Sequence, residues 1–286
     1  MPGPGAPARR PAGLLPTSYG RCLRPYDDHA APALDAEPML SHNSRTERLC
    51  HATGAVLVLS GLAHLMVFAI DGGPWDGPVS WRKPVTFGLS FGLTLIAVTW
   101  VTSYLRIGAR PRDALLVVFA VDCVTEVGGI TLQAWRGVPS HLDMETAFDT
   151  TVSMTLAVGG GVLVILLTVF AVASFRRRPS GPPGMPLALR SGFAILLVAL
   201  ASGVAMIARG VVLARTGHQE AAYHSTAPLK PLHGVSLHAV LVLPLLARSL
   251  SGTSWSDAAK LRLTRAAVAC YAVAVLGAGV WAVVGR

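Results

Sequence analysis

Seven long apolar stretches, separated by short polar segments, constrain this chain more than any other feature of its sequence. A helix that crosses the hydrocarbon core of a membrane needs about 20 predominantly apolar residues. Six of the seven stretches reach that length or fall just short of it. The sequence therefore predicts an all-α fold, a polytopic transmembrane helical bundle with seven spans. The predicted spans are Ala52–Ile70, Val85–Leu105, Ala114–Trp135, Thr150–Phe175, Phe193–Leu213, Pro231–Ala247 and Ala266–Val284.

The distribution of charge predicts the orientation of the bundle. Charged residues make up only 14% of the chain, and the formal net charge is +9. If the N-terminus is cytoplasmic, seventeen of the 24 Lys and Arg residues fall on the inner side and six on the outer side, with Arg209 inside a span. This bias predicts a protein of the cell inner (plasma) membrane with its N-terminus in the cytoplasm and its C-terminus outside. Because topology explains the basic excess, we expect the lipid bilayer as a partner and no nucleic acid.

The longest polar segment precedes the first span. Residues 1–38 are rich in Pro, Ala and Gly, a composition that cannot bury enough apolar surface to fold. We expect residues 1–48 to form a disordered cytoplasmic tail and residues 49–286 to form the seven-helix transmembrane domain. An alternative is that the natural chain starts at Met39.

The third span carries polar residues at helical spacing. They follow the pattern i, i+4, i+7, i+11 and i+14, which places them on one face of a helix: Asp122, Glu126, Gly129, Gln133 and Arg136. A charged side chain near the bilayer centre costs at least a few kcal/mol, so this face should point into the bundle or toward water. We predict a ligand-binding face in which Glu126 is the proton-carrying or cation-pairing group. The structural alternative is that Glu126 pairs with a residue of another helix, such as Arg209.

Three polar residues on other spans reach a similar level. His64 in the first span, Arg209 in the fifth and His238 in the sixth lie about 7–9 Å below the outer boundary, at 1.5 Å per residue. We therefore expect spans one, three, five and six to converge on one outward-facing polar pocket. In this pocket Arg136 and Arg209 would be anion partners, and His64 and His238 would form walls.

The outer loops are also basic, and a basic outer mouth could hold a small anionic ligand. The residues concerned are Arg82, Lys83, Arg136, His141, His224 and His233, the last of which opens the sixth span. The alternative is that they pair with the acids of a neighbouring loop, Asp143, Glu145 and Asp149.

Three function classes remain open. The leading expectation is binding or transport of a small polar or protonatable ligand. The second is a membrane redox protein that binds haem b between His64 and His238, since a haem needs axial ligands from facing helices. The third is a scaffold or sensor whose buried polar residues only specify packing. The sequence assigns no catalytic residue, substrate or oligomeric state.

Other chemistry is excluded by missing patterns. The chain has no HExxH motif and no cysteine cluster, so a zinc site is not expected. His233 and His238 are five residues apart, about 140° around a helix, and cannot grip one ion from one face. All three lysines lie in loops, which excludes an intramembrane Schiff base. Gly88 and Gly92 form a GxxxG pattern, and Gly159 opens a run of three glycines; both predict faces where helices approach closely.

The phrases VSWRKPVTFGLS, ITLQAWRGVPSH and PLHG..LHAVLVLPLL resemble a group of uncharacterised bacterial multi-pass integral membrane proteins. The resemblance covers about residues 50–250 and leaves out the N-terminal tail. It implies the class of membrane protein. It implies no activity or cofactor.

Overall fold

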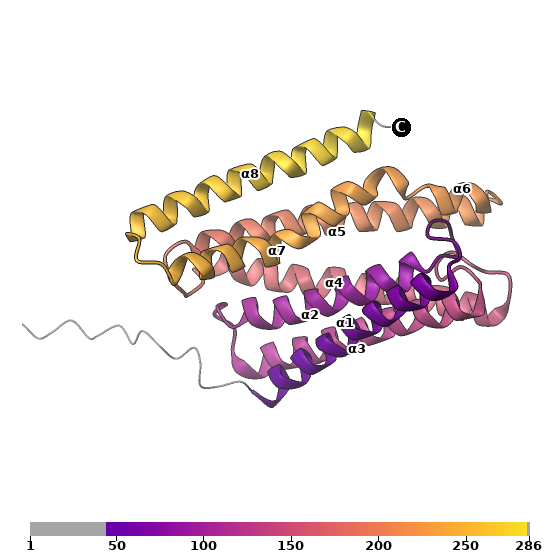
Figure 1. Ribbon diagram of the computed structural model, residues 1–286, viewed down its shortest axis with the longest axis horizontal. Coiled ribbons are helices and arrows are strands. Elements are labelled where there is room, and N and C mark those ends of the chain that lie inside the picture. The colour runs from indigo at the N-terminus through magenta and orange to yellow at the C-terminus, as the bar shows by residue number, and fades with distance from the viewer. Residues whose placement is uncertain (1–43, 285–286) are drawn as a thin grey trace, which may run out of the picture. The chain divides into compact units, whose positions relative to one another are not determined.

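The computed structural model describes residues 44–284, which form helices joined by short loops (Figure 1). Seven helical segments are long and apolar enough to cross a membrane. They coincide with the seven predicted stretches, which confirms the all-α fold class and a multi-pass membrane protein. The helices are α1 (Arg45–Asp71), α2 (Arg82–Thr102), α3 (Ala109–Arg136), α4 (Ala147–Arg176), α5 (Met185–Arg215), α6 (Gln219–His224), the 3-10 helix η1 (Ala227–Leu229), α7 (Lys230–Ser251) and α8 (Asp257–Val284).

Polar caps set the helix ends, and they extend the helices beyond the apolar stretches. Before α1, the Ser44 hydroxyl accepts a hydrogen bond from the Glu47 N–H, and the Glu47 carboxylate accepts one from the Ser44 N–H, each at 3.1 Å. This capping box satisfies two N–H groups that a helix start leaves without partners. Residues 45–48, which the sequence assigned to the tail, therefore form the first turn of α1. Residues 1–43 of the predicted tail lie outside the described residues.

The sixth span is longer than its apolar pattern. α6 and η1 precede α7, so the apolar segment runs over Gln219–Ser251. Pro231 lies in the first turn of α7, where a proline removes no helical hydrogen bond. Pro244 is buried inside α7, and the helix continues through it.

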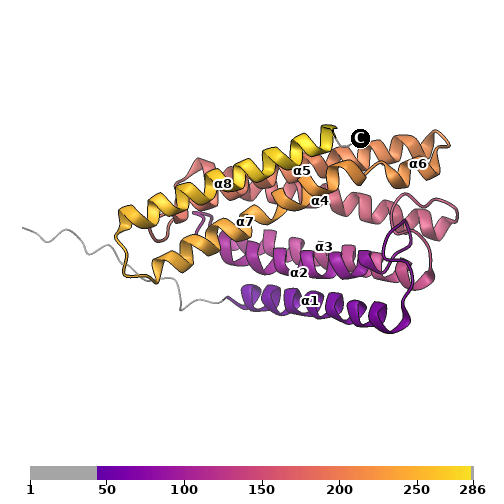
Figure 2. The ribbon, with the colours of Figure 1, turned by 45° about the horizontal axis from the view of Figure 1, so that its top comes forward.

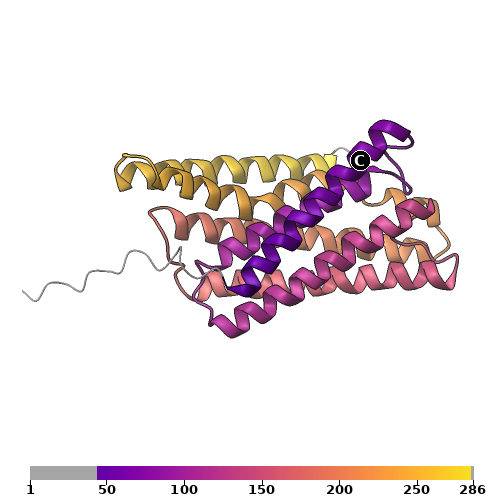
Figure 3. The ribbon, with the colours of Figure 1, turned by 60° about the horizontal axis from the view of Figure 1, so that its bottom comes forward.

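The helices form two groups joined through α4. α1, α2 and α3 pack against one another, as do α5, α7 and α8, while α4 packs against both α3 and α5. A further contact joins α2 to α7. Figure 2 shows α8 at one edge of the bundle and α1 at the opposite edge. In Figure 3, α1 runs obliquely across the neighbouring helices.

Glycines allow α1 and α2 to approach backbone to backbone. A Cβ added at Gly88 would lie 2.8 Å from the Cα of Gly61, and one added at Gly92 would lie 2.6 Å from the carbonyl oxygen of Gly54. Small residues permit this close approach, which replaces the hydrophobic drive that is missing in lipid. The predicted packing role of Gly88 and Gly92 is thereby confirmed.

Buried aromatic side chains form the centre of the bundle, and apolar side chains also cover much of its outside. Phe119, Phe170 and Phe193 are fully buried and come from α3, α4 and α5. By contrast, Val273 and Leu276 of α8 are about two-thirds exposed, at 68% and 69%. A large exposed apolar surface on a helix of this length suits contact with lipid.

The two ends of the bundle are named here by their arginines. The Arg136 end contains residues 72–81, 137–146 and 216–229, and it lies on the right in Figure 1, where α6 is labelled. The Arg112 end contains residues 103–108, 177–184 and 252–256, together with the start of α1.

Candidate functional site

Asp122 and Glu126 lie one turn apart on the face of α3 that packs against α4. Their side chains are buried, with residue exposures of 7% and 3%. Both carboxyls reach the backbone of Gly159 on α4. A Cβ added there would lie 2.6 Å from Oε1 of Glu126 and 2.8 Å from Oδ1 of Asp122. A glycine at this position of α4 is therefore what leaves room for the two carboxyls.

The carboxyl pair lies near the middle of the bundle. α3 has 28 residues, and Asp122 is about 21 Å from its Arg136 end at 1.5 Å per residue. Burial at this depth makes a lone negative charge expensive, by a few kcal/mol at least.

The two acids lack protein partners for part of their oxygen atoms. Within residues 44–284, Oδ2 of Asp122 and Oε1 of Glu126 are buried without any hydrogen-bonding partner. The salt bridges found in that part of the chain also leave both residues out. Because a buried polar atom without a partner is costly, a proton or a bound cation is needed to stabilise these carboxyls.

Arg209 does not supply the missing charge. Its side chain is exposed on α5, and α4 lies between α3 and α5 in the packing order. The structure therefore does not bring Arg209 to Glu126, although the two residues were expected to lie at similar depth. Residue number sets the depth of a side chain along its helix, but the order in which the helices pack decides which other side chains it can reach.

Gln133 and Arg136 belong to a separate polar cluster at the Arg136 end. The Gln133 amide donates to Oδ1 of Asp149 over 3.0 Å, and the Arg136 guanidinium pairs with the same oxygen and donates to the Gln133 carbonyl. The Thr146 hydroxyl donates to Oδ2 of Asp149 and accepts the Asp149 N–H. The guanidinium also lies 4.6 Å from the centre of the Phe148 ring.

These four residues, Gln133, Arg136, Thr146 and Asp149, are called the Asp149 cluster below. Its bonds join the end of α3 to the start of α4. The pairing of Arg136 with Asp149 is the alternative that the sequence left open, an outer arginine bound by an acid of the next segment. Gln133 and Arg136 are thus tied to protein partners about two turns away from the carboxyl pair.

His64 is held between its own helix and α3. Its Nδ1 lies 2.7 Å from the Ser60 carbonyl oxygen, and the Trp135 indole N–H donates to its Nε2 over 3.0 Å. Trp81 stacks near the His64 ring and meets Trp135 edge to face. An indole nitrogen can only donate, so Nε2 accepts and Nδ1 carries the proton given to Ser60. Sequence reasoning missed this role of Trp135.

The histidines of α7 face other partners. Nδ1 of His233 lies 2.9 Å from the Ala199 carbonyl oxygen on α5, and Nδ1 of His238 lies 2.6 Å from the Gly234 carbonyl oxygen on its own helix. α7 packs against α2, α5 and α8, whereas α1 packs against α2 and α3. α2 thus lies between His64 and His238.

This arrangement does not fit haem held by His64 and His238. Two axial ligands have to face each other across the macrocycle, and Nε2 of His64 is already engaged by Trp135. Among residues 44–284, no group of three or more His, Cys, Asp or Glu side chains is arranged to hold a metal ion.

Two other basic residues of the predicted outer mouth also lie beside local acceptors. Arg82 pairs with Asp76 at 3.1 Å, and the Lys83 ammonium donates to the Pro78 carbonyl over 2.6 Å. Asp76 was not among the acids expected to pair with these residues. Burial and the nearby charge of Lys83 lower the pKa of His141 to about 4, so its imidazole is neutral at physiological pH.

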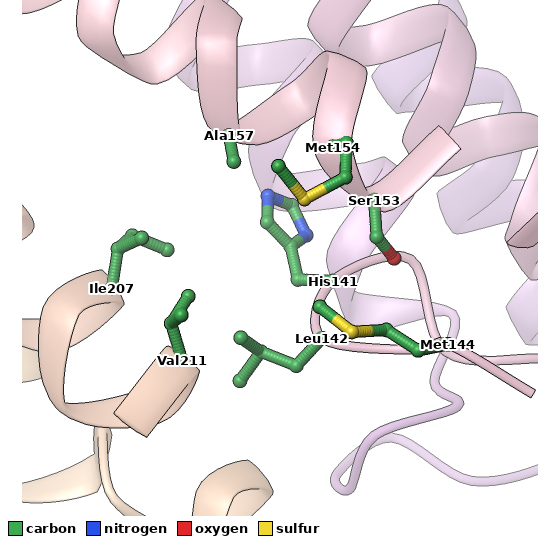
Figure 4. A pocket seen from close by; sticks show the side chains of 8 residues that line it. All are labelled: His141, Leu142, Met144, Ser153, Met154, Ala157, Ile207 and Val211. Carbon is green, nitrogen blue, oxygen red and sulfur yellow. The ribbon is translucent and has the colours of Figure 1, made fainter. Parts of the chain in front are cut away.

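Two small pockets lie at the Arg136 end. None of the polar span residues predicted to bind a ligand lines either pocket, but His141 and Lys83 of the predicted basic mouth line the first and the second, respectively. One is bounded by the 137–146 loop, α4 and α5. In Figure 4 the His141 ring lies beside Met154 of α4, while Ile207 and Val211 project from α5 on the other side. The second lies beside the start of α2. Its lining residues are Pro78, Val79, Ser80, Lys83, Ile130, Ala134, Val138 and Ser140.

The first pocket is mostly apolar, so it does not match the expected polar pocket. Its lining residues are His141, Leu142, Met144, Ser153, Met154, Ala157, Ile207 and Val211. The predicted convergence of spans one, three, five and six is replaced by separate sites on α1–α3, α3–α4 and α5–α7. Of these, only the carboxyl pair on α3 combines deep burial with unpartnered acid oxygens in the described part of the chain.

Comparisons with family models, with curated proteins and with solved structures found no match for this chain. The resemblance to bacterial multi-pass proteins therefore stays a prediction. Any function has to be argued from the geometry of α3 and α4.

Proposed function

We propose that this multi-pass membrane protein binds, and exchanges across the bundle, a proton or a small cation at the carboxyl pair Asp122–Glu126. The observation that carries the proposal is the burial of both carboxyls against Gly159, with an oxygen of each lacking a protein partner. Glu126 is the proton-carrying or cation-pairing group, and Asp122 is its neighbour on the same face. Intramembrane acids of this kind generally mark ion and proton pathways.

Other buried acids of the same protein show what a structural role looks like. Glu47 pairs with Arg112 over 2.6 Å, and Asp149 accepts from three side chains. Each of these carboxylates has its charge matched by an arginine. Asp122 and Glu126 are equally buried but have no arginine or lysine in an ion pair within the described residues. A packing role alone does not account for the difference.

Two neighbouring carboxyls have a chemical use that one does not. When both are ionised they repel each other, so the pair holds one proton tightly and gives up the second under other conditions. A small cation between the carboxylates relieves the same repulsion. Proton and cation therefore compete for one site, which is the basis of coupled exchange.

The charge distribution supports an orientation for the proposed exchange. The Arg112 end carries most of the arginines, and the positive-inside rule favours a cytoplasmic position for this end and an outer position for the Arg136 end. The carboxyl pair would then lie near the middle of a cell inner (plasma) membrane.

Infrared difference spectroscopy of the purified protein in detergent tests the proposal. We expect a protonated-carboxyl C=O band that is lost as the pH is raised and is absent from the double variant Asp122→Asn/Glu126→Gln. The matched control is Glu145→Gln, an acid in an exposed position, which should keep the band. Repeating the titration with Na⁺, K⁺ or Mg²⁺ shows whether a cation displaces the proton.

Two results separate exchange from a scaffold. In vesicles with an internal pH dye, wild-type protein should dissipate a pH gradient and Glu126→Gln should not. If the wild type and the double variant give the same spectra at every pH and with every cation, the carboxyl pair does not exchange ions. In that case Asp122 and Glu126 serve only the packing of α3 on α4.

A further inference from the structure

Along the seam between α3 and α4, polar and apolar layers alternate. The Asp149 cluster forms the layer nearest the Arg136 end, and the carboxyl pair with Gly159 forms the inner polar layer. Between them Leu156 of α4 packs on Gly129 of α3, where an added Cβ would lie 2.9 Å from the Leu156 Cδ2. Leu156 is 2% exposed.

The separation between the two polar layers is short. Gln133 and Glu126 are seven residues apart on α3, which is about 10 Å along the helix axis. Leu156 fills this interval on the α4 side, because it lies seven residues after Asp149 and three before Gly159. On α4, Leu156 is the one buried apolar residue between Asp149 and Gly159, and on α3 the interval between Glu126 and Gln133 also contains the buried Ile130.

Several layers of buried apolar side chains separate the carboxyl pair from the Arg112 end. From Asp122 toward the Arg112 end, α3 presents Leu116 and Phe119, with exposures of 0% and 1%. α4 presents Leu167 and Phe170, with exposures of 3% and 0%. Asp122 is ten residues, about 15 Å, from Arg112. Aqueous ions crossing this side would have to pass several fully packed apolar layers.

We propose that Leu156 is the plug that controls access to the carboxyl pair, and that protons or cations reach the pair from the Arg136 end along the α3–α4 seam. This inference rests on the proposed exchange at Asp122 and Glu126. Leu156 does not touch the ion. It is a positioning residue, because its side chain decides whether water can join the two polar layers.

The plug requires a side chain that can move. Gly129 contributes no side chain opposite Leu156, so at this position the leucine lies against the backbone of α3 and no side chain of residue 129 has to move with it. A rotation that removes the isobutyl group from the seam would leave Gln133 and Glu126 separated by space that water can enter.

Labelling with a water-soluble carbodiimide tests the route. This reagent modifies a carboxyl only where it and water can reach it, and mass spectrometry measures the modified fraction of Glu126 and Asp122. In Leu156→Ala the rate of labelling should rise about tenfold or more over wild type. The matched control is Leu167→Ala, which removes a comparably buried leucine of the same helix on the Arg112 side; its labelling rate should stay at the wild-type value.

A second, more conservative variant keeps the test valid if Leu156→Ala does not fold. Leu156→Val removes one methylene and should raise the rate by a smaller factor, and all variants are checked by size-exclusion chromatography and by their helical circular dichroism. Equal labelling rates for Leu156→Ala and Leu167→Ala would overturn the plug. In that case the proposed function could still hold, because the infrared titration of the carboxyl pair would still be present. If the titration is absent as well, both proposals fall.

Discussion

Replacing Gly88 by alanine tests the closest helix contact of the bundle. The new Cβ would lie 2.8 Å from the Cα and N of Gly61 and 2.9 Å from the Leu57 carbonyl oxygen, whereas ordinary contacts begin at 3.4 Å. All three atoms belong to the backbone of α1, so no side chain can rotate away. The two helices must separate by roughly half an ångström at this layer, and the contacts on either side of it are loosened.

The expected loss follows from known costs of overpacking. Inserting a methyl group into a packed interface costs about 1–3 kcal/mol, and the better helix propensity of alanine returns less than about 1 kcal/mol of that. We expect the free energy of unfolding to fall by about 2 kcal/mol. The control is Gly128→Ala on α3, where an added Cβ meets no atom within 4 Å. That variant gains helix propensity only and should be unchanged or slightly more stable.

Reversible unfolding in mixed micelles, followed by circular dichroism as the fraction of denaturing detergent is raised, gives the two free energies. Comparing two glycine-to-alanine variants cancels most of the effect of the substitution on the unfolded chain. If Gly88→Ala and Gly128→Ala differ by less than about 0.5 kcal/mol, well under the overpacking cost, α1 and α2 do not approach through their glycines. The reasoning on this contact would then be refuted.

Two further predictions use the same unfolding measurement. Glu47→Gln leaves the guanidinium of Arg112 buried without its counter-charge and should lower the free energy of unfolding by about 3 kcal/mol. The control Asp257→Asn removes a mostly exposed carboxylate and should lower it by less than about 0.5 kcal/mol. Equal losses for the two variants would contradict a buried ion pair between Glu47 and Arg112. Because the pKa of His141 is about 4 in the folded protein and about 6.5 in an unfolded chain, the unfolded state binds more protons between these values. The free energy of unfolding should therefore fall as the pH is lowered from about 6.5 to 4, by up to about 3 kcal/mol, and His141→Gln should flatten this slope; an unchanged slope would show that the imidazole is not held neutral.

The spans could be predicted from the sequence because apolar length is a local property. Every predicted stretch lies almost wholly within one helix of the structure. The ends were less accurate, since hydropathy does not detect polar caps. α1 begins at Arg45 and not at Ala52 because Ser44 and Glu47 cap it. α8 likewise begins at Asp257, nine residues before the apolar run at Ala266.

The site was predicted only as far as one helix determines it. Helical spacing placed Asp122 and Glu126 on one face of α3, and they do share a face toward Gly159. Their relation to other helices required the order of packing, which residue spacing does not contain. Arg209 was expected at the right depth, but α4 separates it from α3.

His64 is a second case in which its depth along a helix did not identify its partner on another helix. Its depth in the first span suggested a ligand for the pocket, but its Nε2 accepts the Trp135 indole N–H. Nothing in the sequence marks Trp135 as the partner of His64, because tryptophan is common at membrane boundaries. Only the packing of α1 on α3 shows that the two residues bond to each other.

The stability of the double variant Asp122→Asn/Glu126→Gln distinguishes a role in ion exchange from a role in helix packing. If Asp122 and Glu126 existed to specify the packing of α3 on α4, Asp122→Asn/Glu126→Gln would break that packing and lower the free energy of unfolding. If they exist to bind ions, the protein pays for two buried acids whose oxygens lack partners, and amides of the same size avoid the cost of charge. We therefore expect the double variant to unfold at the same or a higher denaturant fraction than wild type, while the carboxyl infrared band is lost. A clear destabilisation with no change in ion exchange would assign the pair to the fold.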